Sequence, residues 1–122
     1  MKALIANIAR VAAWLLAIII TVLSVVPPSM RPETDVPHNL EHFVPFLVTG
    51  VAFGFGYDRR AFLVAAAMVV FTAAIEILQI FVPGRHARLS DFVVDAIAVT
   101  AGVALGALVG RTWAKASKNQ TL

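Results

Sequence analysis

The chain has 122 residues, of which 60% are apolar and only 14% are charged, whereas soluble domains average roughly 25% charged residues. This composition excludes a disordered chain and argues against an ordinary soluble enzyme, and the length suits a single domain. Cysteine is absent, which excludes disulfides, thiolate catalysis and cysteine-ligated zinc. The net charge of +3 does not predict nucleic-acid binding, because flanking positive charges are expected of a membrane chain. The composition therefore predicts a small integral membrane protein.

Four apolar segments occur along the chain and predict helices. A helix needs roughly 20 residues to cross the hydrocarbon core, and only a helix satisfies its own backbone hydrogen bonds there. Because so short a chain leaves only short connections, neighbouring helices are expected to be antiparallel. The sequence thus predicts an all-α integral membrane protein, a four-transmembrane-helix antiparallel bundle over residues 1–114, with a polar tail over 115–122. The predicted helices cover about 4–26, 38–57, 61–83 and 91–110.

The distribution of basic residues predicts the orientation of this bundle. Seven Lys and Arg residues fall on one side of the predicted bundle, and three fall on the other. Because basic residues concentrate on the cytoplasmic side of membrane proteins, both termini, the tail and the turn at 57–61 are expected in the cytoplasm. The larger group is Lys2, Arg10, Arg59, Arg60, Arg111, Lys115 and Lys118, and the smaller is Arg31, Arg85 and Arg88.

Ionisable and polar residues gather at the outer ends of the third and fourth predicted helices. Thr72, Glu76 and Gln79 share one stripe near the end of the third helix. Asp91 and Asp95 open the fourth helix four residues apart, so both carboxylates share a face. Ionisable groups inside a membrane are costly and mark functional sites. No comparable set is expected in the inner half of the bundle.

His42, at the start of the second helix, and Arg85, in the loop after the third, are expected on the same outer side. A guanidinium offers forked donors to phosphate oxygens, which suits Arg85 to an anionic head group. Arg88 is interpreted as an interfacial anchor. The sequence leaves catalytic residues unassigned, and it predicts no metal and no cofactor. The predicted ligand-binding residues are His42, Glu76, Gln79, Arg85, Asp91 and Asp95.

Structural roles stay open for several of these residues. Asp91 follows Ser90 and fits a helix N-cap, and Glu76 fits a hydrogen bond between helices. His42 fits an interfacial histidine bonded to a backbone carbonyl. Asp95 lies a full turn deeper than Asp91, too deep to cap, which favours a pairing or ligand-binding role.

Glycines spaced four residues apart occur in the second and fourth helices, and such spacing lets helices approach closely. Packing is their main expected role, and a homo-oligomer formed through the same glycines is the alternative. The glycines are Gly50, Gly54, Gly102 and Gly106.

A separate pattern, H-x-x-E-H from His38 to His42, matches a zinc-protease signature and leaves a metal hydrolase open.

Several short motifs recur in one order along the chain. The first helix ends in Leu-Ser-Val-Val-Pro, the second begins with His-Phe, and an E-x-x-Q pair precedes Pro-Gly-Arg and an aspartate. With these motifs, over roughly residues 15–110, the chain resembles the VanZ-like family of small bacterial membrane proteins. It departs from the family pattern at His38 and Asn39, where Asp-Lys is usual, and at Asp95, where Asn is usual.

The resemblance implies a multi-pass protein of the bacterial cytoplasmic (inner) membrane. It also links the chain to teicoplanin resistance, and so to cell-wall precursors at the outer face. We therefore expect the outer polar residues to bind or handle a membrane lipid, a lipid-linked envelope precursor or a related anionic glycolipid, with an effect on glycopeptide susceptibility. The alternatives are a non-catalytic scaffold or assembly factor, a proton-coupled small transporter using Glu76, and the metal hydrolase.

Overall fold

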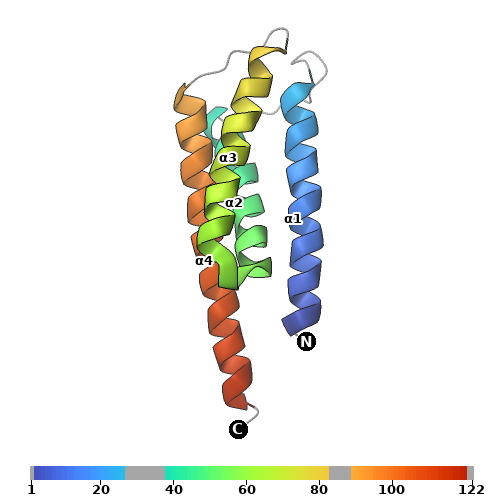
Figure 1. Cartoon of the computed structure of the whole chain (residues 1–122), viewed down its shortest axis with the longest axis vertical. Coiled ribbons are helices and arrows are strands. Elements are labelled where there is room, and N and C mark those ends of the chain that lie inside the picture. The colour runs from blue at the N-terminus through green and yellow to red at the C-terminus, as the bar shows by residue number, and fades with distance from the viewer. Residues whose placement is uncertain (1, 27–37, 83–88, 121–122) are drawn as a thin grey trace.

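A computed structural model describes residues 2–26, 38–82 and 89–120, and within them the chain is helical without strands. This confirms the predicted all-α class. The side chains of residues 38–42 and 117–120 lie outside the described part. The elements are α1 (Lys2–Val25), α2 (His38–Gly56), the 3-10 turn η2 (Asp58–Arg60), α3 (Ala61–Ile80) and α4 (Leu89–Gln120) (Figure 1).

Three helical segments are long and apolar enough to cross a membrane, namely Lys2–Val25, Asp58–Ile80 and Leu89–Ala116. The apolar part of α2 is shorter, Phe43–Gly56. At 1.5 Å per residue it rises about 21 Å, against roughly 30 Å of hydrocarbon. The chain is therefore a membrane protein with three described segments of spanning length, and the crossing of α2 stays a prediction.

The helix ends gather at two ends of the molecule. Figure 1 shows the C-terminal ends of α1 and α3 beside the N-terminal ends of α2 and α4 at one end. The N-terminus of α1 and the connection from α2 to α3 lie toward the other. We name the first the acidic end, after Glu76, Asp91 and Asp95, and the second the basic end, after the basic residues near it. These are Lys2, Arg10, Arg59, Arg60 and Arg111.

Two helix boundaries differ from the prediction. α4 continues to Gln120 instead of ending near 110, so the predicted polar tail is helical as far as that residue. The reason is that the sequence after Gly110 contains helix-favouring Ala and Lys residues and no proline. α3 ends at Ile80 instead of 83, because a tighter turn of i to i−3 bonds, from Phe81 N–H to the Leu78 carbonyl (3.1 Å), closes it.

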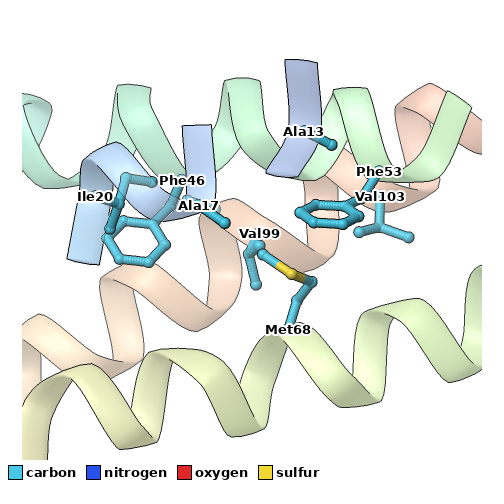
Figure 2. Packing of buried hydrophobic residues seen from close by; sticks show 9 residues of the cluster. Ala13, Ala17, Ile20, Phe46, Phe53, Met68, Val99 and Val103 are labelled. Atoms are coloured by element: carbon cyan, nitrogen blue, oxygen red, sulfur yellow. The ribbon is translucent and has the colours of Figure 1, made fainter. Parts of the chain in front are cut away.

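An apolar core joins the four helices. Ala13, Ala17 and Ile20 form the buried stripe of α1, at the spacing of one helical face. Figure 2 shows Phe53 of α2 beside Val103 of α4, and Met68 reaching from α3 toward Val99. Most other large apolar side chains are exposed at the helix surfaces, as expected of a protein whose solvent is lipid.

The closest helix pair is α2 with α4, and glycine makes this approach possible. A Cβ built on Gly50 would lie 2.5 Å from the carbonyl oxygen of Val99. The same construction on Gly54, Gly102 or Gly106 would overlap the carbonyl oxygens of Val103, Leu47 or Val51, respectively. Any larger side chain would push the backbones apart. The four glycines therefore serve packing within one chain, and a homo-oligomer formed through them stays a prediction.

Candidate functional site

The acidic end carries a polar stripe on the inner face of α3. Thr72, Glu76 and Gln79 are all buried there, with exposed fractions of 0%, 7% and 5%. The Thr72 hydroxyl donates to the Val69 carbonyl of its own helix (2.7 Å). Glu76 and Gln79 project from the same face, so the stripe predicted from their spacing points into the bundle and away from lipid.

A second pair of polar side chains lies on the facing part of α4. Asp91, in the first turn of that helix, is 8% exposed, and Asp95, one turn deeper, is fully buried. A carboxylate in the first turn lies near the positive end of the helix dipole, which stabilises the charge of Asp91. Asp95 lies beyond the capping positions, so the helix end does not stabilise its carboxylate in this way. The helix dipole therefore explains the position of Asp91 but not that of Asp95.

The buried carboxylates of α3 and α4 each lie a short way inside their helix, counted from its end at the acidic end. Glu76 is four residues before the last residue of α3, and Asp95 is six residues after the first residue of α4. These separations correspond to about 6 Å and about 9 Å along the helix axes. α3 and α4 pack against each other, and each carries a buried carboxylate within two turns of its end at the acidic end.

The remaining predicted site residues lie outside the described part. The structure describes neither the side chain of His42 nor any part of Arg85. The side chains of the H-x-x-E-H pattern are also outside the described part. Among the residues that are described, no group of three or more His, Asp or Glu side chains is placed to hold a metal ion. That all six predicted residues form one binding site stays a prediction.

Besides Thr72, two buried hydroxyls were not among the predicted site residues. Ser24 is 8% exposed near the end of α1, and Thr49 of α2 is fully buried. The Thr49 hydroxyl donates to the Pro45 carbonyl (2.7 Å), so it is bonded within its own helix. Ser24 continues the buried stripe of Ala17 and Ile20 at helical spacing, which is the signal that would have placed it inside the bundle.

The basic end holds a polar cluster that the sequence analysis did not predict. Asp58, the first residue of η2, is only 9% exposed, and its Oδ2 lies 3.0 Å from Nζ of Lys2. Its backbone carbonyl accepts bonds from Nε (3.3 Å) and Nη2 (3.1 Å) of Arg111. A single residue in the turn thus connects the start of α1 with α4. Polar side chains therefore cluster at the basic end of the bundle as well as at the acidic end.

Aromatic and basic side chains extend this cluster along α1. Nε of Arg10 donates to the Gly56 carbonyl (2.7 Å), and its guanidinium carbon lies 4.9 Å from the centroid of the Tyr57 ring. Nε1 of Trp14 donates to the Tyr57 hydroxyl (3.1 Å). These contacts fix the end of α2 against α1.

One sequence signal could have identified Asp58. Among the seven acidic residues of the chain, it is the only one in segments that the distribution of Lys and Arg assigns to the cytoplasmic side. A single carboxylate among many cations is expected to pair with one of them. The sequence does not show which one, because Lys2 lies 56 positions away along the chain.

Comparisons with known proteins agree with the resemblance predicted from the motifs. A family model described as VanZ/LLP1 matches residues 5–111, from the first turns of α1 to the middle of α4. No curated protein and no solved structure matches the chain. The match covers every described residue of the acidic end. It also covers the basic residues of the basic end, with the exception of Lys2.

Proposed function

Because the chain belongs to the VanZ/LLP1 family, we propose that it is a multi-pass membrane protein that binds or handles the head group of an envelope lipid or lipid-linked cell-wall precursor. The observation that carries this proposal is the burial of Glu76 and Asp95 inside an apolar bundle, each within two turns of a helix end. Ionisable groups at such positions are costly to keep and typically serve a pathway or a ligand.

The chemistry of the acidic end suits the non-phosphate part of such a head group. Carboxylates accept hydrogen bonds, and the carboxamide of Gln79 both donates and accepts. Sugar hydroxyls and peptide N–H groups of a lipid-linked precursor supply donors for Glu76 and Asp95. From the sequence we add Arg85 and His42, the first for a phosphate or pyrophosphate and the second for a polar head-group atom.

We further propose that α2 crosses the membrane, which makes an antiparallel bundle of four spans with both termini in the cytoplasm. The distribution of Lys and Arg supports this orientation. In this orientation the acidic end lies at the outer leaflet of the inner membrane. A head group presented at the outer face would then reach Glu76 and Asp95 without crossing the bilayer.

The absence of cysteine allows a clean test of this topology. Ala3, Ser90 and Ala116 are exposed positions, and each is replaced by Cys in a separate variant. In intact spheroplasts a membrane-impermeant maleimide should label only the Ser90→Cys variant, and lysis should expose the other two. Labelling of the Ala3 and Ala116 variants on opposite sides would mean an odd number of spans, and α2 would not cross.

Retention of a precursor tests the binding proposal directly. The purified chain in mild detergent is incubated with a polyprenyl-pyrophosphate disaccharide-pentapeptide, and native mass spectrometry measures the bound fraction. Glu76→Gln and Asp95→Asn should each lower retention about tenfold, the effect of one charge-assisted hydrogen bond. Asp58→Asn is the matched control, since it makes the same isosteric change at the basic end. Equal retention in wild type and both acidic-end variants would reject the proposal.

A further inference from the structure

A cavity of about 390 Å³ opens at the basic end, away from the proposed head-group site. It lies between the start of α1 and the turn that joins α2 to α3. Four of its lining side chains are cations, and Asp58 is the one carboxylate among them. The four cations are Lys2, Arg10, Arg59 and Arg60.

The charges around this cavity favour an anion. Asp58 is neutralised by Lys2 at 3.0 Å, so the lining keeps a formal excess of three positive charges, four from Lys and Arg minus one from Asp. Neither Arg59 nor Arg60 makes a side-chain hydrogen bond or ion pair with another described residue, and both are exposed. Their guanidinium groups therefore offer forked donors to an oxyanion.

One wall of the cavity is already ordered. Arg10 is held by the Gly56 carbonyl and by the Tyr57 ring, and its Nη1 also donates to Oδ1 of Asn7 (3.3 Å). Trp14 fixes the Tyr57 hydroxyl from the other side. A preorganised wall lowers the entropy cost of ligand binding, because these side chains need not be immobilised by the ligand.

Apolar surface adjoins the charged rim. Ala3 and Ala6 of α1 line the cavity itself. Phe62 and Leu63, which directly follow the two arginines in the chain, are 86% and 64% exposed. A cavity that combines cations with a neighbouring lipid-facing apolar surface suits a ligand with an anionic head and acyl chains.

We infer that this cavity binds the phosphate group of an anionic phospholipid in the leaflet at the basic end. Arg59 and Arg60 contact the phosphate oxygens, Arg10 and Lys2 contribute positive potential, and the acyl chains lie along the exposed surface of α3. The site is independent of Glu76 and Asp95, so it anchors the bundle in the membrane whether or not the acidic end binds a precursor.

Competition between two lipids tests this inference. The full chain in mild detergent receives equimolar dioleoylphosphatidylglycerol and dioleoylphosphatidylcholine, and native mass spectrometry compares the amounts retained. Each cation near an anionic lipid is worth about fivefold in binding, so the Arg59→Gln/Arg60→Gln variant should lose about 30-fold in phosphatidylglycerol retention. Lys115→Gln/Lys118→Gln removes the same net charge elsewhere and should retain wild-type binding.

Two further measurements separate the sources of the signal. Excess inorganic phosphate should displace the lipid if the phosphate group alone suffices, and should leave it bound if the acyl chains are also required; both results support the site. The Arg59→Gln/Arg60→Gln variant should retain the polyprenyl-pyrophosphate precursor like wild type, which separates this site from the acidic end. Undiminished retention in the Arg59/Arg60 variant, or equal retention of both lipids by wild type, would overturn the inference.

Discussion

The two ends of the bundle use polar residues in different ways. At the basic end, Asp58, Arg10 and Tyr57 are connected by hydrogen bonds and ring contacts to helices distant in the sequence. At the acidic end, Glu76 and Asp95 are buried a turn or more inside their helices. The first set connects helix ends through contacts with partly exposed cations, whereas the second places carboxylates inside the bundle.

The two sets therefore differ in depth more than in residue type, and in a membrane bundle depth sets the cost of an ionisable group. A charge at a helix end remains partly solvated, so pairing it is inexpensive and its partner can be a surface lysine such as Lys2. A carboxylate at the level of Asp95 is desolvated, and a protein without a use for it would replace it with an apolar residue. The acidic end is therefore the better candidate for function.

The largest expected effect comes from breaking the α2–α4 contact that connects the two ends. Gly106→Leu would force a side chain into the Val51 carbonyl, so the free energy of unfolding should fall by about 3 kcal/mol. Thermal unfolding and gel filtration in detergent measure the loss. Ala104→Leu places the same leucine side chain on the exposed face of α4 and should unfold like wild type. A Gly106→Leu chain of unchanged stability but altered oligomeric state would assign this glycine to self-association instead.

The next effect distinguishes the ends by burial. Asp95→Ala removes a fully buried carboxyl group and leaves a cavity, which should cost about 2 kcal/mol of unfolding free energy. Salt screens exposed charges but reaches buried ones poorly, so this loss should be the same in low and high salt. Thermal unfolding across a salt series checks it. A loss that disappears in high salt would mean that Asp95 behaves like a surface charge.

A smaller effect with the opposite salt dependence is expected at the basic end. Asp58→Ala removes the partner of Lys2, whose side chain is 28% exposed, so about 1 kcal/mol should be lost at low salt and little at high salt. The same salt series measures it. Asp58→Asn retains the shape that packs near Gly110 and isolates the contribution of charge. Identical salt profiles for Asp58→Ala and Asp95→Ala would remove the distinction between the two ends.

Much of the fold follows from local sequence patterns. Apolar run length and helical spacing predicted four helices, the shared stripe of Glu76 and Gln79, and a packing role for the glycines of α2 and α4, because each depends on neighbours within one or two turns. The motifs around Glu76, Gln79 and Asp91 also predicted the family, which the match over residues 5–111 confirms.

What the sequence could not predict depends on distant contacts. Asp58 looks like a solvated turn residue until the fold brings Lys2 and Arg111 to it from opposite ends of the chain. Helix boundaries were also missed where no strong stop signal exists, as after Gly110. Depth counted along one helix identified Asp95 as unusual, but it cannot show which side chains from other helices face it.

The smallest effect tests whether the basic end is held by hydrogen bonds at all. Trp14→Phe keeps an aromatic ring against Phe53 (ring centroids 5.3 Å apart in wild type) and removes the donor to the Tyr57 hydroxyl. The free energy of unfolding should fall by about 0.6 kcal/mol, the mean for hydrogen bonds between helices in membrane proteins. Tyr57→Phe removes the acceptor and should cost the same.

The double variant of Trp14 and Tyr57 decides between two explanations of that loss. If one hydrogen bond is responsible, the double variant should lose no more than either single variant, as a thermodynamic cycle of unfolding measurements would show. Additive losses would mean that the two rings contribute by packing and that the bond is incidental. The contrast between the ends would then depend on the contacts of Lys2 and Arg111 with Asp58 and of Arg10 with Gly56, and the salt series would be its main test.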